Sequence, residues 1–260
     1  MSEGEDSANG NGRPIIVPGR EATARPLPRR FYTDVSLGVS GPPPAHTVLL
    51  GGRIARTPGK RPLELPRAAL AEAVAREWAS QATHIDPAAM PLTRLVNTAI
   101  DGVAERMTEV AADVVKYAGS DLLCYRADFP EGLIARQRTH WDPVLEWAAQ
   151  AHGAHFVVAQ GIMPVLQPAG AIARIAEAVA RLDALRLTAL HVMTTLMGSA
   201  ILALAVVEGC LSPENAWEAA HVDEDWQIAE WGEDAEASAR REKRWAEMRA
   251  AAELTRLVVA

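Results

Sequence analysis

Residues 187–207 read LTALHVMTTLMGSAILALAVV and contain no Asp, Glu, Lys or Arg. A helix at a protein surface has a polar face, whereas this stretch is apolar or small nearly all round. It must therefore be surrounded, either by lipid or by the rest of the protein. Its length permits a membrane span, but polar residues interrupt it: His191, Thr194, Thr195 and Ser199. We expect a buried central helix, with a transmembrane helix as the alternative.

The composition is that of a soluble globular protein. The chain has 260 residues, 49% of them hydrophobic and 23% charged, enough for one large domain or two modest ones. A net charge of −7 disfavours a general nucleic-acid binder, which needs a basic face. The two cysteines, Cys124 and Cys210, form no CxxC pair and fit a reducing compartment. No targeting signal is visible, so we expect a location in the bacterial cytoplasm.

Three regions follow one another along the chain. Residues 1–28 read as a polar tail, although Ile15–Val17 offer an apolar patch. Residues 29–66 read as short strands, with a hairpin turn at Gly51–Gly52, and form a domain too small to be stable alone. Residues 67–260 read as helices. The predicted fold class is therefore α+β: a small N-terminal antiparallel β domain followed by a larger α-helical domain with a buried central helix.

Local sequence signals predict where several of the helices begin. Asp142–Pro143 and Ser212–Pro213 each pair an N-cap with a proline at the first helical position, and each predicts a helix start. Residues 235–258 predict a long last helix. Gly198 and Ser199, inside the central stretch, would let a neighbouring helix approach closely.

Catalytic and metal-binding motifs are missing from the sequence. No phosphate loop, GxGxxG, HExxH or GxSxG is present, and we expect no cofactor. His152 and His155 are three residues apart with His140 nearby, but Gly153 would interrupt a helix between them. A metal site needs three or four converging ligands, so we expect none here. Residues 136–138 (RQR) and residues 51–53 (GGR) could hold an anion, but a solvated or ion-paired segment and a hairpin turn are the simpler interpretations.

The unusual segment is DEDWQIAEWGEDAE, residues 223–236, in which seven of 14 residues are acidic and none is basic. Acids at the start of the last helix would match its dipole. Trp226 and Trp231 could anchor the segment to the core. Indoles among exposed carboxylates also suit a protein-docking surface. The residues alone leave both interpretations open.

At this segment the sequence resembles a known family, the chaperones that assemble the catalytic head of F-type ATP synthase by binding its free alpha subunit. The similarity rests on AHVDEDWQIAEWGEDAEASARR and on EWASQATHIDPAAMPLTRLVNTAID, residues 77–101. Shorter blocks also match: RRFYTDVSLG, GGRIARTP, SDLLCYRAD, RQRTHWDPVLEW, GSAILALAVVEG and SPENAWEAAH. Together the blocks run from about Arg29 to Leu257. At the hairpin this chain has Gly51–Gly52 where the family pattern suggests Asp-Gly, which preserves the turn.

The resemblance implies no enzymatic activity and no cofactor. It implies that the protein holds the unassembled alpha subunit soluble until the beta subunit replaces it. We also expect no metal site and a monomer when the protein is free. The partner-binding residues that the family pattern suggests are Asp223, Glu224, Asp225, Trp226, Gln227, Glu230, Trp231, Gly232 and Glu233. In the 77–101 block, Leu92, Leu95 and Ile100 are expected in the core, while Arg94, Asn97, Thr98 and Asp101 could fix the junction between helices.

Two rival classes remain from the residues alone. One is an enzyme with an active site in the cleft between the β and helical domains. The other is a membrane protein that spans by residues 187–207.

Overall fold

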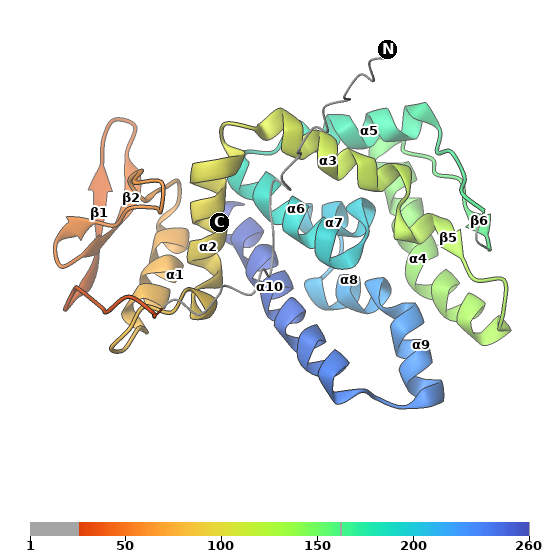
Figure 1. Cartoon of the computed structure of the whole chain (residues 1–260). Coiled ribbons are helices and arrows are strands. Elements are labelled where there is room, and N and C mark those ends of the chain that lie inside the picture. Colours follow the sequence, from red (N-terminus) through yellow and green to blue (C-terminus); the bar gives the residue numbers. More distant parts are fainter. Residues whose placement is uncertain (1–25, 162, 260) are drawn as a thin grey trace, which may run out of the picture.

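The computed structural model describes residues 26–161 and 163–259, so most of the predicted tail at 1–28, including Ile15–Val17, lies outside the described residues. A small antiparallel sheet stands beside a larger helical body (Figure 1). This arrangement confirms the predicted α+β fold class. The proposed boundary between residues 66 and 67 stays a prediction. Among the residues described, no helix is both long and apolar enough to cross a membrane.

The sheet is built around one central strand. β2 pairs antiparallel with β1, β3 and β4, and one of its faces packs against helix α1. The predicted turn at Gly51–Gly52 joins β2 to β3, with φ of +56° and +75°, a left-handed conformation that glycine adopts without strain. The strands of this sheet are β1 (Val35–Ser40), β2 (Ala45–Leu50), β3 (Arg53–Ile54) and β4 (Glu64–Leu65).

The rest of the chain is mostly helical. The α-helices are α1 (Ala68–Ala79), α2 (Pro91–Thr98), α3 (Met107–Gly119), α4 (Glu131–His152), α5 (Ala169–Val179), α6 (Ala184–Met197), α7 (Ala200–Val207), α8 (Pro213–Ala220), α9 (Val222–Trp231) and α10 (Ala235–Val259). Shorter elements are the 3-10 turns Pro87–Ala89 and Leu122–Cys124, the π-helical turn Ala99–Val103, and the parallel pair β5 (Tyr125–Arg126) and β6 (Ala159–Gln160).

The central stretch is buried, as predicted, but it is two helices and not one. α6 ends at Gly198, whose φ of +69° takes the chain out of the helix. Ser199 then caps α7, its Oγ accepting the Leu202 N–H at 3.0 Å. Every residue of α7 is buried. α10 and α3 pack on α6, and α4 and α8 pack on α7, so the two helices form the centre of the body (Figure 1).

The prediction that a helix begins at Asp142–Pro143 is wrong. α4 begins at Glu131 and runs through Pro143 to His152, where Gly153 ends it with φ of +69°. Trp141 and Val144, on either side of the proline, are both buried. Packing of this face stabilises the helix against the loss of one backbone hydrogen bond at the proline. Asp142 serves instead as the ion-pair partner of buried Arg126, at 2.8 Å.

Candidate functional site

Most of the acidic segment forms a helix of its own, α9, while its last acids, Asp234 and Glu236, lie at the start of the last helix, as expected. Three acids, Asp223, Glu224 and Asp225, fill its first turn, where the helix dipole favours negative charge. Gly232, with φ of +89°, ends it after Trp231. Asp234 then begins α10, its Oδ1 accepting the N–H of Glu236 at 2.8 Å. This hydrogen bond and a second one from the Ala237 N–H lower the pKa of the Asp234 carboxyl.

One face of α9 is fastened to α4 and α10. Gln137 of α4 is buried, and its Nε2 donates to Asp223 at 2.7 Å. Asp225 pairs with Arg241 of α10. The Trp226 ring lies against Gly132, with the Arg136 guanidinium carbon 5.1 Å from the ring centroid. Asp223, Asp225 and Trp226 therefore anchor α9 to its neighbouring helices, α4 and α10.

A Gly132→Ala variant is expected to loosen α9 from α4. A Cβ at residue 132 would lie 2.6 Å from Cη2 of the Trp226 indole, so this stiff ring must move. We expect a loss of about 1–3 kcal/mol in the free energy of unfolding, with faster amide exchange along α9. Chemical denaturation and hydrogen-exchange mass spectrometry measure the two effects.

Gly170 gives the matched control for this variant. Gly132 and Gly170 are both the second residue of their helix, and a Cβ at 170 meets nothing within 4 Å. Gly170→Ala should therefore be neutral or slightly stabilising. Equal stability of the two variants would contradict the packing of Trp226 on α4.

The other face of α9 is exposed within the described part of the chain. The Trp231 side chain is 88% exposed, and Gln227, Glu230 and Glu233 are also exposed. Among the described residues, Trp231 is the most exposed of the tryptophans. We call Gln227, Glu230, Trp231, Gly232 and Glu233 the acidic tryptophan surface. An apolar ring surrounded by carboxylates can take up a partner with a hydrophobic pocket and a basic rim.

A groove of about 590 Å³ runs beside this surface, between α9 and α10. Its floor is aromatic, with the Trp217 and Trp245 rings 5.4 Å apart. His221, which packs on Trp217 at 4.0 Å between ring centroids, is buried, and this burial lowers the pKa of its imidazole. The indoles of Trp217 and Trp245 give the groove an aromatic wall, and four carboxylates line it with them: those of Glu224, Glu233, Asp234 and Glu242.

The remaining sequence candidates are dispersed. His152 pairs with Glu208 at 3.2 Å, while His140 and His155 lie elsewhere on and after α4. Within residues 26–161 and 163–259, no three His, Cys, Asp or Glu side chains are grouped to hold a metal ion. In the RQR stretch of α4, Gln137 is buried and bonded to Ala127 and Asp223, so it is structural.

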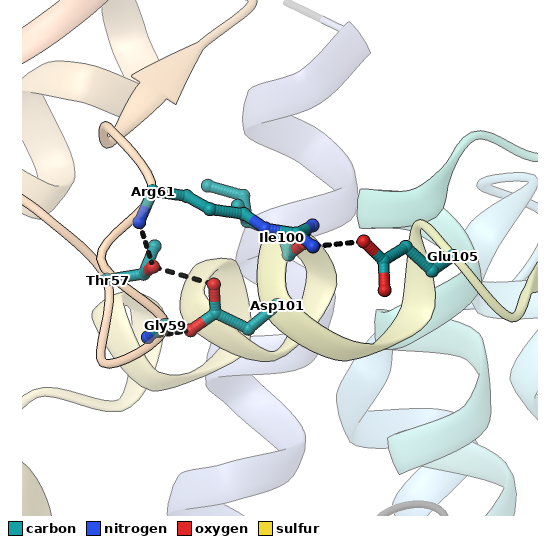
Figure 2. A network of polar contacts seen from close by, with 6 residues as sticks. All are labelled: Thr57, Gly59, Arg61, Ile100, Asp101 and Glu105. Carbon is teal, nitrogen blue, oxygen red and sulfur yellow. Dashed lines mark hydrogen bonds and ion pairs between the residues drawn. The ribbon is translucent and has the colours of Figure 1, made fainter.

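The 77–101 block fixes a junction, but between the sheet and the helical body as well as between helices. The Asp101 carboxylate accepts the Thr57 hydroxyl at 2.6 Å and the Gly59 N–H at 2.7 Å (Figure 2). Arg61 donates to the Ile100 carbonyl at 2.7 Å and pairs with Glu105. The acceptors, Ile100, Asp101 and Glu105, lie in or just after the π-helical turn. The donors all lie in the loop between β3 and β4. We call this network the junction latch.

The other residues of that block follow the expectation only in part: the Thr98 hydroxyl donates to the Arg94 carbonyl within α2 and not across the junction. Leu92 is buried, and Leu95 and Ile100 are partly buried against the core. Arg94 reaches Glu247 of α10 at 3.5 Å. Glu77 caps the start of α2, accepting the N–H groups of Leu92 and Thr93.

Sequence reasoning missed the residues that orient α9. Gly132 and Gln137 lie about 90 residues upstream of it, and nothing in their local pattern marks them as its partners. A buried polar residue such as Gln137 is recognised only when its hydrogen-bond partners are known.

Comparisons with known proteins agree with this fold. Residues 29–149 match the model of a family described as ATP12 chaperone protein. The crystal structure of the Atu1473 protein from Agrobacterium tumefaciens, a candidate chaperone, is 47% identical, with a TM-score of 0.86 over 90% of this chain and 88% of that chain. Atp12 from Paracoccus denitrificans is 43% identical, with a TM-score of 0.84 over 89% of this chain and 98% of that chain.

Proposed function

The chain belongs to the ATP12 chaperone family, the ATP synthase assembly chaperones that its sequence resembles, and on this premise we propose that it binds the unassembled alpha subunit of the F-type ATP synthase head. In this proposal the protein acts as a free monomer in the bacterial cytoplasm, without catalytic activity or cofactor. It keeps the alpha subunit soluble until the beta subunit takes its place.

The observation that carries the proposal is the exposure of Trp231 between Glu230 and Glu233. Burying a large aromatic ring stabilises a complex, so an indole that is 88% exposed in the free chain is suited to a partner. The acidic segment as a whole carries seven negative charges and no positive ones. Of the nine predicted binding residues, five form the exposed acidic tryptophan surface, and Glu224 lines the groove beside it. The other three, Asp223, Asp225 and Trp226, hold α9 against α4 and α10.

A chaperone of this kind must cover an apolar interface and then leave it. An orphan subunit exposes a large interface that invites aggregation. A surface with one aromatic anchor and many carboxylates gives moderate affinity and selects its partner by charge. Such a surface can be displaced by a subunit that buries a larger apolar area.

The test is co-expression with the cognate alpha subunit in the absence of the beta subunit, followed by size exclusion of the soluble fraction. We expect a discrete complex of the two chains that dissociates when the beta subunit is added. If the alpha subunit aggregates and this protein elutes alone, the proposed function is wrong. A metabolite found bound to the purified chain would then favour the enzyme with a cleft between sheet and helices.

A further inference from the structure

A second groove, of about 540 Å³, lies where the sheet region meets the helical body. We call it the junction groove. Its volume is in the range of ordinary ligand pockets. The loop 56–58, α1, α2, α6 and α10 all contribute to its walls. The apolar part of the lining includes Trp78, Ile85, Met90, Leu95 and Val192.

The junction latch holds one wall of this groove in place. Thr57, which lines the groove, donates its hydroxyl to Asp101 at 2.6 Å (Figure 2). Gly59 approaches the same carboxylate so closely that a Cβ there would lie 2.6 Å from Asp101 Oδ1. Two fixed points therefore tie the loop to the π-helical turn, and the groove is a preformed feature of the fold.

The polar groups of the groove are mainly donors. Arg94 has a carboxylate, Glu247, at 3.5 Å from one terminal nitrogen, and its buried Nε has no acceptor among the described residues. The buried Nε1 of Trp78 likewise has none within the described part of the chain. The lining holds two arginines, Arg56 and Arg94, and one carboxylate, Glu247, so it is net positive in a chain of net charge −7. Such a lining favours an occupant that supplies acceptors.

We propose that the junction groove binds an extended segment of the client subunit, in which an apolar side chain stands next to a carboxylate. The apolar side chain would lie among Trp78, Met90 and Leu95, and the carboxylate would pair with Arg94. This inference rests on the proposed function for the identity of the client.

The junction groove is net positive and the acidic tryptophan surface is negative, so the two favour client segments of opposite charge. Both border α10, but Trp245 lines one groove and Glu247 the other, and residues two apart on a helix face opposite ways. One client segment cannot fill both grooves from the same side of α10. A client that uses both presents a basic region to α9 and an acidic, apolar segment to the junction groove, which fixes its orientation.

The test measures the affinity of the purified full chain for the alpha subunit. Arg94→Gln removes the guanidinium, and Asn97→Trp fills the groove with a bulky ring at a partly exposed lining position. Each is expected to weaken binding at least tenfold while leaving the thermal unfolding midpoint within a few degrees. Arg174→Gln is the matched control, because Arg174 also pairs with one carboxylate, that of Glu177 at 3.0 Å, but lies on α5 away from the groove.

The outcomes separate the groove from the function. Loss of affinity in both groove variants, with the Arg174→Gln control unchanged, supports the groove. If both bind like the unmodified chain, the groove proposal is overturned and the proposed function stands. If the unmodified chain does not bind the alpha subunit, the proposed function is wrong, and so is the proposal that a segment of this subunit occupies the groove. A photo-crosslinking amino acid at position 97 gives an independent readout should either variant fold poorly: a crosslink to the alpha subunit supports the groove, and its absence from a bound complex overturns it.

Discussion

An Asp121→Ala variant is expected to unfold with a free energy about 2–6 kcal/mol below that of the unmodified chain. Asp121 is fully buried between two parts of the core. Its Oδ1 accepts the N–H of Leu123 and its Oδ2 that of Ile201, both at 3.1 Å. Alanine leaves both buried N–H groups without an acceptor, at a cost of about 1–3 kcal/mol each. Urea unfolding followed by circular dichroism measures the loss.

Asp183 provides the control, because it caps a helix from an exposed position. Its Oδ1 accepts the Arg186 N–H at 3.0 Å at the start of α6. Asp183→Ala should lose about 1 kcal/mol, the usual effect of removing an N-cap. A loss at Asp121 no greater than this would show that its two hydrogen bonds do not hold α7 to the Leu122–Cys124 turn.

Asp121 also predicts that the stability of the fold depends on pH. Burial raises the pKa of the Asp121 carboxyl from 3.8 to about 6. Between these values the folded chain keeps a proton that the unfolded chain has released, so the contribution of Asp121 to stability falls as pH rises from about 4 to about 6. His221 acts the other way, since its lowered pKa makes stability rise with pH toward 6.5. Comparing Asp121→Asn with the unmodified chain across this window isolates the Asp121 contribution, because the variant has no carboxyl to titrate there.

A Trp231→Ala variant is expected to bind the alpha subunit at least about 30-fold more weakly, the effect of losing an aromatic anchor worth about 2 kcal/mol. Because the Trp231 ring is 88% exposed, the folded chain itself should lose little stability. Phe31→Ala is the control, since the Phe31 side chain is 73% exposed and its ring contacts that of Tyr32, at 5.3 Å between centroids, in the segment before β1. Titration of the alpha subunit, monitored by calorimetry, measures both affinities.

Glu230→Lys tests the charge of the same surface. It places a cation beside the exposed Trp231 and should lower affinity about tenfold, mainly through slower association at low salt. Glu72→Lys, on the exposed face of α1, makes the same change in net charge. If Trp231→Ala and Glu230→Lys both bind like their controls, the acidic tryptophan surface is not the docking site, whatever the outcome of the co-expression.

Some features of the site follow from the sequence and others do not. The acidic segment and its two tryptophans are visible in the sequence, because a run of carboxylates without basic residues is unusual. Their roles are not visible. Trp226 is an anchor and Trp231 is exposed, although both lie in the same helix. The difference arises because residues five apart on a helix point in directions about 140° apart, and α4 covers only one of them.

The sequence by itself determined that residues 187–207 are buried, because a stretch without charges must be enclosed by apolar surroundings. It also determined the Gly51–Gly52 turn and the last helix, since these depend on local backbone preferences. Only the tertiary structure decided that the central stretch breaks at Gly198. A capped second helix requires acceptors for its first N–H groups, and Asp121, about 80 residues away in the chain, supplies one. Tertiary packing likewise carried α4 through Pro143, because the buried face around Trp141 and Val144 outweighs one missing hydrogen bond.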